Sequence, residues 1–223
     1  MTHRESRKVE IKPGAPIPGL VLAGGLSRRM GGGDKSLRLL GSKPLILHVI
    51  ERFARQASPL AINANGNPDL FLAYGLPVIP DADTDFAGPL AGILASLRWA
   101  ARAVPEARFL ATAACDTPFF PDVLVARLLA AVNASSASAI AVAASDGRLH
   151  PIFALWPMAL ADELAAALAS GERKVTAFIE RRPHIVVEFP FIQRPGRVLD
   201  PFFNINTPDE FAEAEALSWI YHE

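Results

Sequence analysis

The chain has 223 residues, of which 51% are hydrophobic and 20% are charged, and its formal net charge at pH 7 is −1. This length allows a single domain with a substantial core, and the balanced charge excludes the basic surface typical of proteins that bind DNA or RNA. The one cysteine, Cys115, excludes an internal disulfide and a zinc site made of several cysteines.

The N-terminal stretch, residues 1–16, has charged residues and two prolines but no apolar run, which argues against a secretory signal. No apolar segment of the chain reaches the ~18 residues that a membrane-spanning helix needs. We therefore expect a flexible arm over residues 1–16 and a single domain over residues 17–223. We also expect a cytoplasmic monomer that binds neither nucleic acid nor a membrane.

A glycine-rich loop follows the first apolar run, Leu20–Ala23, which is bounded by glycine and is typical of a buried strand. Glycines let a phosphate chain approach the backbone N–H groups, and Arg28, Arg29 and Lys35 add cationic donors. The spacing matches neither the Walker loop nor the dinucleotide-binding motif. The loop therefore predicts a nucleoside triphosphate site. Its glycines are Gly24, Gly25, Gly31, Gly32 and Gly33.

Beyond this loop, segments with helical periodicity alternate with short apolar runs. The expected helices are 44–55, 88–97, 121–132, 158–169, 175–181 and 208–221. The expected strands are 20–23, 60–64, 76–79, 108–113, 139–143, 149–155 and 185–189. Asp146-Gly147 predicts a hairpin turn, and Thr207 with Glu210 predicts a capping box on the last helix. The alternation predicts an α/β fold: a mainly parallel sheet with helices on both faces and a small antiparallel edge.

Several polar residues follow expected strands, and ligands bind at the carboxyl ends of strands in such sheets. Asp116 provides a carboxylate suited to Mg²⁺, although it can also cap the next helix. Asn63 can hydrogen-bond a base edge or a ribose, or simply form a turn. Asp81 and the two carboxylates that follow it can bind a metal or form a solvated acidic loop. The convergence of these segments with Gly24 on one sheet edge favours a binding site.

Five further residues are candidates for an acceptor site, each with a structural alternative. His150 can contact an acceptor phosphate or pack structurally. Arg173 and Lys174 can bind an anionic substrate or form an exposed turn. Asn204 and Asn206 can assist the metal or the acceptor, or only cap the final helix.

Together these motifs resemble the molybdenum cofactor guanylyltransferases, bacterial enzymes of the NTP-transferase superfamily that attach GMP to the phosphate of molybdopterin. The matching segments span Leu22 to Glu210, nearly the whole chain. In order they are LAGG, SRRMG, DK, NAN, VIPD, GPLAG, CDTPF, HP, GERKV and NINTPDE.

The resemblance implies a Rossmann-like sheet, GTP as substrate, Mg²⁺ as cofactor, and release of pyrophosphate. It implies that Asp116 binds the metal and that Lys35, Asp116 and Arg28 act in catalysis. It also implies that the partners of this chain are GTP, molybdopterin, and molybdoenzymes or their chaperones. The residues expected to bind GTP are Leu22, Ala23, Gly24, Gly25, Lys35, Asn63, Asp81 and Asp116.

Three alternatives to this function remain open from the sequence. Within the same class of reaction, the chain can transfer a cytidylyl group to the same cofactor, or a nucleotide to a sugar phosphate. Outside it, the chain can be a non-catalytic nucleotide-binding delivery protein, although Asp116, whose loss would mark such a protein, is present.

Overall fold

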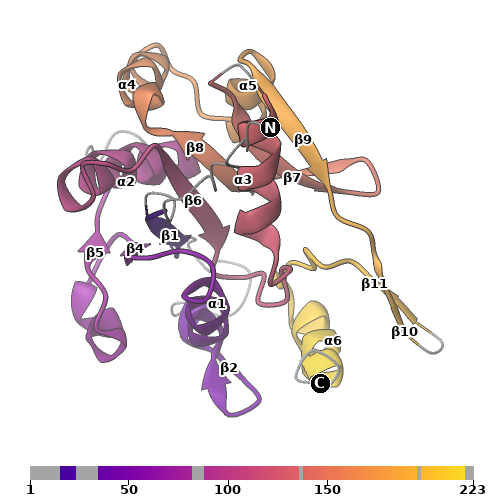
Figure 1. The fold of residues 1–223 in the computed structure, drawn as a ribbon. Coiled ribbons are helices and arrows are strands. Elements are labelled where there is room, and N and C mark those ends of the chain that lie inside the picture. Colours follow the sequence, from indigo (N-terminus) through magenta and orange to yellow (C-terminus); the bar gives the residue numbers. More distant parts are fainter. Residues whose placement is uncertain (1–15, 24–34, 82–87, 136–137, 195–196, 219–223) are drawn as a thin grey trace, which may run out of the picture.

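A seven-stranded sheet forms the centre of the computed structural model, which describes residues 16–23, 35–81, 88–135, 138–194 and 197–218. Its strands are β1 (Gly19–Leu22), β4 (Leu60–Asn63), β5 (Val78–Ile79), β6 (Phe109–Ala114), β7 (Ile140–Ser145), β8 (Arg148–Pro157) and β9 (His184–Glu188). The spatial order is β5-β4-β1-β6-β8-β7-β9 (Figure 1). Only β8 runs against the other strands, so the predicted mainly parallel sheet is confirmed.

The antiparallel strand β8 begins at the predicted hairpin turn, where Asp146 and Gly147 have φ values of 49° and 72°. The expected antiparallel edge differs in position, because β8 lies between β6 and β7 and β9 forms the margin of the sheet. The residues at the end of β8, from Phe153 to Pro157, are all buried. Such a continuous apolar run suits a strand with neighbours on both sides.

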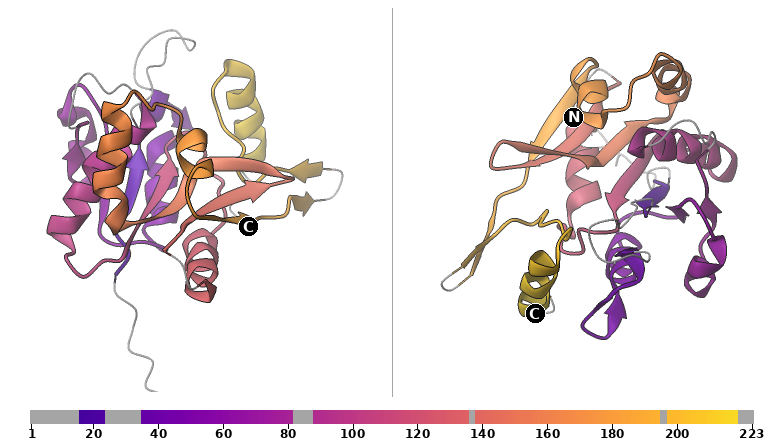
Figure 2. Two further views of the ribbon diagram at one scale, coloured as in Figure 1. Left: turned by 90° about the horizontal axis from the view of Figure 1, so that it is seen from above. Right: turned by 180° about the vertical axis from the view of Figure 1, so that it is seen from behind.

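Helices cover both faces of the sheet, as predicted. The helices on the two faces are α1 (Leu45–Phe53) and α3 (Leu124–Ala134) on one, and α2 (Pro89–Ala103), α4 (Ala161–Ala169) and α5 (Val175–Glu180) on the other. Because successive side chains of a strand point to opposite faces, Val21 packs in the first layer and Leu20 in the second. The two layers can be followed from above and from behind in Figure 2.

A third apolar cluster joins the C-terminal helix α6 (Pro208–Ser218) to the rest of the molecule. Phe211 and Leu217 of this helix pack with Leu45, Phe119 and Ile205. The cluster lies beside the segment that follows β6 and the one that precedes α6. It therefore fixes the position of two loops that carry candidate site residues.

The remaining elements are short. They are the antiparallel pairs β2 (Leu39–Leu40) with β3 (Lys43–Pro44) and β10 (Ile192–Arg194) with β11 (Arg197–Leu199), and the 3-10 helices η1 (Lys35–Leu37), η2 (Pro68–Tyr74) and η3 (Met158–Leu160). The β10–β11 ribbon projects away from the main sheet (Figure 2). None of the helices in the described ranges has the length and apolar character needed to span a membrane.

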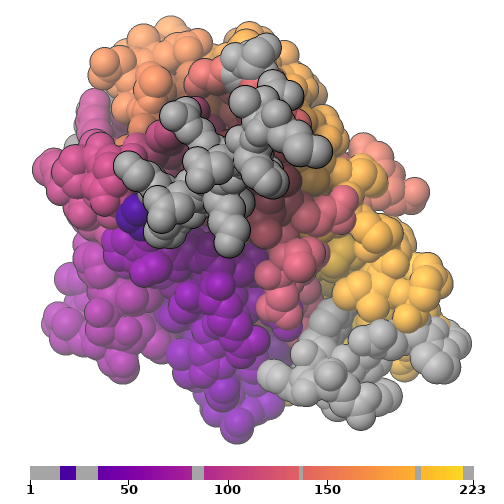
Figure 3. Space-filling model, viewed as in Figure 1, coloured from indigo at the N-terminus to yellow at the C-terminus, as the bar shows by residue number. Residues whose placement is uncertain are grey.

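The strand ends are level at one edge of the sheet. Leu22, the last residue of β1, pairs with Asn63 of β4 and with Ala114 of β6. Asn63 in turn pairs with Ile79 of β5. Four parallel strands therefore end side by side, and the residues that follow them share this edge. In the space-filling view, the violet to magenta surface up to α2 lies at the left and below, the orange surface of α4 lies directly above α2, and the yellow surface lies at the right (Figure 3).

Candidate functional site

The carboxyl end of β1 lies at the middle of this edge. Ala23 N–H donates to Asn63 O over 2.8 Å, and Cys115 N–H donates to Leu22 O over 3.0 Å. These bonds hold Leu22 and Ala23, which directly precede the glycine-rich loop, between β4 and the segment after β6. The expected loop residues Gly24, Gly25 and Arg28 lie outside the described residues.

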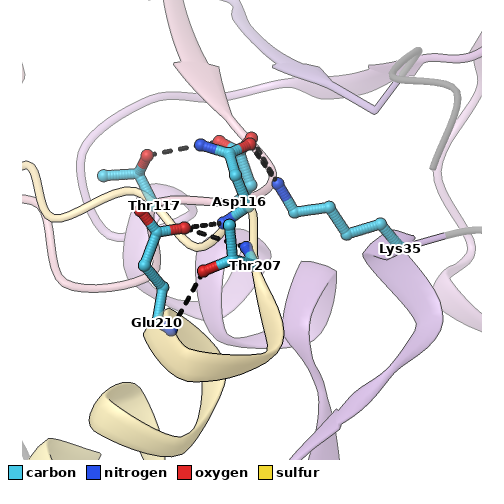
Figure 4. Close-up of polar contacts among 6 residues, drawn as sticks. Lys35, Asp116, Thr117, Thr207 and Glu210 are labelled. Carbon is cyan, nitrogen blue, oxygen red and sulfur yellow. Dashed lines mark hydrogen bonds and ion pairs between the residues drawn. The ribbon is translucent and has the colours of Figure 1, made fainter. Parts of the chain in front are cut away.

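A charged group forms on one side of β1 (Figure 4). Lys35, the first residue of η1, places its Nζ 2.9 Å from Asp116 Oδ2 and 2.7 Å from Asn206 Oδ1. The side chains of Lys35 and Asp116 are 12% and 21% exposed, so the pair is partly shielded from water. An ammonium group has three N–H donors, and these two oxygens engage two of them. The third can serve a ligand oxygen.

The loop that carries Asn206 is fastened to the same group. Ile205 N–H donates to Asp116 O over 2.9 Å. Glu210 Oε2 accepts the N–H groups of Asn206 and Thr207 over 2.7 and 2.8 Å, and Glu210 N–H donates to Thr207 Oγ1 over 3.2 Å. The last two bonds are the predicted capping box, which is confirmed.

The charge of Glu210 is stabilised in this position. Burial acts to raise the pKa of its carboxyl group, but hydrogen bonds from the backbone of Asn206 and from Thr207, together with the Lys35 charge, outweigh burial. The net effect holds the pKa of Glu210 below its ordinary value. The carboxylate therefore stays ionised and remains an acceptor at neutral pH.

A second polar group lies on the other side of β1. Asn63 is 3% exposed, and its Nδ2 donates to Ile79 O and to Asp81 Oδ1, both over 2.9 Å. Asn65 donates from Nδ2 to Asp81 Oδ2 over 2.8 Å and accepts the Asp81 N–H over 3.0 Å. The Asp81 carboxylate is thus held by two amides, with lone pairs left for a ligand donor.

Gly92 of α2 makes room for this group. A Cβ built on Gly92 would overlap the side-chain amide of Asn63. The glycine therefore lets the helix approach the strand end closely enough to enclose Asn63. The structure brings Asn63 and Asp81 together at this edge of the sheet.

The structure places His150 in a buried polar chain rather than beside Lys35. Its Nε2 lies 2.6 Å from Ser145 Oγ, which donates to Asp200 Oδ1 over 2.9 Å. The ring stacks on Phe202 with centroids 4.3 Å apart, and the residue is 8% exposed. Burial lowers the pKa of His150 from its ordinary value, with the Asp200 charge opposing the change. These hydrogen bonds connect the β7–β8 hairpin to the loop before α6.

The other acceptor candidates are exposed. Arg173 donates from Nη1 to the carbonyl oxygens of Leu168 and Glu172, both over 2.8 Å, so these bonds are local to the end of α4. Lys174 is exposed directly before α5, and Asn204 is exposed in the loop before α6. Of the five candidates, Asn206 is the one that the structure joins to Lys35.

The residues present suit Mg²⁺ bound together with phosphates. The described residues contain no group of three His, Cys, Asp or Glu side chains placed to hold an ion on their own. Asp116 offers a partly exposed carboxylate at the strand edge. Mg²⁺ usually takes one or two carboxylates, with substrate phosphates and water completing its octahedron. The donor set therefore fits a metal that arrives with a triphosphate.

Three residues of the site were not among the sequence candidates. Asn65 is visible in the N-A-N alternation, which puts it on the same side of an extended chain as Asn63. Gly92 appears in the G-P-L-A-G segment, where a helix-interior glycine usually has a packing reason. Thr117, whose Oγ1 lies 3.3 Å from Asp116 Oδ1, has no local signal beyond its place after Asp116.

Known proteins match this chain over most of its length. A model of the MobA-like NTP transferase domain matches residues 19–185. A molybdenum cofactor guanylyltransferase from Mesorhizobium japonicum is 53% identical over 202 residues, which cover 90% of this chain and 95% of that relative. Both findings agree with the resemblance seen in the motifs.

Solved structures share the fold. The molybdopterin-guanine dinucleotide biosynthesis protein A from Archaeoglobus fulgidus superposes with a TM-score of 0.70 at 26% identity, over 92% of this chain and 100% of that one. A Mycobacterium tuberculosis protein solved in complex with manganese has a TM-score of 0.63 at 16% identity, over 90% and 98% of the two chains. The chain therefore belongs to the MobA-like NTP transferases, a family of nucleotidyltransferases that includes the molybdenum cofactor guanylyltransferases.

Proposed function

We propose that this chain transfers GMP from GTP to the terminal phosphate of molybdopterin, releases pyrophosphate, and forms a guanine dinucleotide cofactor. The observation that carries the proposal is the Lys35–Asp116–Asn206 group at the carboxyl edge of the sheet. Its support is the 53% identity to a relative named for this activity.

The reaction is an in-line displacement. A phosphate oxygen of molybdopterin forms a bond to the α-phosphorus of GTP, and the bond from that phosphorus to the α–β bridging oxygen breaks. The electron pair leaves with pyrophosphate. The acceptor phosphate is already ionised at neutral pH, so the step requires no covalent enzyme intermediate. The work of the protein is to bring two anions together and to neutralise their charge.

Lys35 suits the role of holding the triphosphate. Its Nζ is fixed by Asp116 and Asn206, so the ammonium is in place before a ligand binds. A charge that is positioned in advance stabilises the developing negative charge on the leaving pyrophosphate without reorganisation. The glycine-rich loop, Gly24 and Gly25 included, would add backbone N–H donors, and Arg28 a second cation.

Asp116 is the residue that we propose holds Mg²⁺. The bound ion would neutralise phosphate charge and polarise the α-phosphoryl group. The manganese complex of the Mycobacterium tuberculosis protein supports a divalent metal in a protein of this fold. Among the described residues, Asp116 offers one carboxylate beside Lys35, and this is consistent with the preference of Mg²⁺ for substrate phosphates as its other ligands.

Asp81 is the residue that we propose reads the base. The Watson–Crick edge of guanine presents two adjacent donors, N1–H and the N2 amino group, which match the two oxygens of a carboxylate. Cytosine presents acceptors at the corresponding positions, which a carboxylate repels. Asn63 and Asn65 hold Asp81 from both sides and so set the plane of its carboxylate.

The test is pyrophosphate release in the presence of molybdopterin and Mg²⁺, with GTP, CTP, ATP and UTP compared. Release with GTP alone supports both the reaction and the choice of base. Release with CTP would make the chain a cytidylyltransferase for the same cofactor. Release only when a sugar phosphate replaces molybdopterin would show that the acceptor is a sugar phosphate. GTP binding without release under any condition would favour a delivery protein.

A further inference from the structure

We propose that Glu210 is a positioning residue for nucleotidyl transfer, acting through Asn206 on Lys35 and Asp116. This inference rests on the proposed function, because it assigns a role within the same site. The Glu210 carboxylate contacts neither Lys35 nor Asp116 in any hydrogen bond of the described residues. Its influence passes through the loop that precedes α6.

The contacts of Glu210 go beyond those of a capping box. In that motif, the third residue of a helix accepts the backbone N–H of the N-cap residue. Glu210 Oε2 makes this bond to Thr207 over 2.8 Å and also accepts the N–H of Asn206 over 2.7 Å. The second bond is unnecessary for capping. It fixes the backbone of the residue whose side chain holds Lys35.

Asn206 is therefore positioned from two sides. On one side, Ile205 is fully buried, and its N–H donates to Asp116 O over 2.9 Å. On the other side, the Glu210 carboxylate holds the Asn206 N–H. Between these two attachments, Asn206 Oδ1 lies 2.7 Å from Lys35 Nζ. Figure 4 shows Glu210 in the first turn of α6 and Thr207 directly before the helix, with Asp116 above Thr207 and Lys35 to the right in this view.

This arrangement matters for the chemistry because the Lys35 ammonium donates to both Asp116 and Asn206. If Asn206 is displaced, Asp116 becomes the sole partner of the Lys35 ammonium within this group. The interaction between Lys35 and the Asp116 carboxylate then becomes stronger. A metal ion must then compete with Lys35 for the same oxygen. Loosening Asn206 is therefore expected to weaken metal binding and to lower kcat, while base recognition at Asp81 is left intact.

The experiment compares three variants of Glu210 with a matched control on the same helix turn. Glu210→Ala removes both hydrogen bonds, and Glu210→Asp keeps the charge but is one methylene too short to make them. Glu210→Gln loses the charge but keeps a carbonyl oxygen that can accept both N–H groups. Asp209→Ala is the control, because Asp209 is an exposed acidic residue in the first turn of α6.

The readouts are kcat, the KM for GTP, and the affinity for Mn²⁺ in the presence of GTP, measured by electron paramagnetic resonance. Loss of an outer partner of this kind typically lowers activity or metal affinity about 10- to 100-fold. We expect Glu210→Ala and Glu210→Asp to lose at least about 10-fold in kcat and in Mn²⁺ affinity, with a smaller change in the KM for GTP. Glu210→Gln should retain most of both.

Equal behaviour of Glu210→Ala and Asp209→Ala would overturn the proposal, because loss of the two Glu210 hydrogen bonds would then affect the site no more than a change at an exposed position of the same helix turn. A loss in Glu210→Gln as large as in Glu210→Ala would also overturn it, since charge rather than hydrogen bonding would be responsible. The Mn²⁺ titration needs no turnover. A chain that transfers no nucleotide would refute the proposed function and still test the role of Glu210.

Discussion

Lys35 Nζ lies 2.9 Å from Asp116 Oδ2, although 81 residues separate the two along the chain. Lys35 begins a 3-10 helix beyond the glycine-rich loop, and Asp116 follows the central strand β6. The parallel order of β1 and β6 brings them together, since both segments leave the sheet at the same edge. In the proposed mechanism, Lys35 provides the cation that binds phosphate and Asp116 provides the carboxylate that binds the metal.

The carboxylate of Asp116 should be essential for turnover. Asp116→Asn keeps the shape of the side chain but removes the charge that pairs with Lys35 and that we propose binds Mg²⁺. We expect a loss of about 10²-fold or more in kcat, with the melting temperature largely retained. Asp146→Asn is the control, because Asp146 lies in a hairpin turn where asparagine tolerates positive φ. Turnover close to that of the control would remove Asp116 from the metal site.

Lys35 should contribute to binding of the triphosphate and to transfer. Lys35→Met keeps the aliphatic stem but removes the ammonium, and removal of one such donor typically costs about 10²- to 10³-fold in rate. Lys43→Met is the control, since Lys43 pairs with Glu51 at an exposed position. Steady-state kinetics with GTP provide the comparison. An unchanged kcat/KM in Lys35→Met would show that the ammonium has no part in the reaction.

Asp81 should determine the preference for guanine. In Asp81→Asn, one of the two acceptor oxygens becomes an NH₂ donor, which faces a donor on guanine. We expect GTP affinity to fall about 10-fold or more, while affinity for CTP should fall less. The control is Asp69→Asn in η2, where Asp69 is exposed. Calorimetric titration with both nucleotides measures the ratio of GTP affinity to CTP affinity. If this ratio is the same in Asp81→Asn and in the control, base recognition does not depend on Asp81.

Gly92 should be required for the position of Asn63. Alanine normally stabilises a helix interior by about 1 kcal/mol relative to glycine. Here the added Cβ would displace the Asn63 amide from Ile79 O and Asp81. We expect Gly92→Ala to lower the free energy of unfolding by about 1–3 kcal/mol and to weaken GTP binding.

A double-mutant cycle separates the stabilisation of the helix by alanine from the displacement of the Asn63 amide. In an Asn63→Ala background the overlap disappears, so Gly92→Ala should become neutral or stabilising there. Chemical denaturation of the four proteins provides the free energies. A penalty of the same size in both backgrounds would show that Asn63 is not the group that Gly92 accommodates.

His150 should make stability depend on pH below neutrality. Burial lowers the pKa of His150 in the folded state below its ordinary value of 6.5. The unfolded chain therefore takes up a proton first as pH falls. Stability from this residue is full above about pH 6.5 and declines as pH falls toward the folded pKa. Denaturation at about pH 7.5 and 5.5 should show a smaller pH effect in His150→Gln than in the unmodified chain.

Local patterns in the sequence contain enough information to predict the main sheet and its helices. The apolar runs around Val21 and Leu110 are buried on both faces, as a central parallel strand requires, and periodicity identifies α1 and α3 within a few residues of their bounds. The capping box of Thr207 and Glu210 also forms as predicted. These features depend on neighbours close in sequence, so a local pattern suffices.

The contacts that build the site are not local. Lys35 meets Asn206 across 171 residues, and no periodicity encodes which loops converge on one strand end. The β10–β11 ribbon was not expected either, because its strands are only three residues long and expose Val198. β8 lies inside the sheet because it pairs with both β6 and β7, and no local pattern in the sequence specifies these two partners.

The most direct test of the central claim follows the α-phosphate of GTP. The chain is incubated with α-³²P-labelled GTP, Mg²⁺ and molybdopterin, and the products are separated and identified by mass spectrometry. The account predicts that the label moves to a molybdopterin guanine dinucleotide while unlabelled pyrophosphate is released in equal amount. Label recovered only as GTP, or as GDP with inorganic phosphate, would contradict nucleotidyl transfer by this chain.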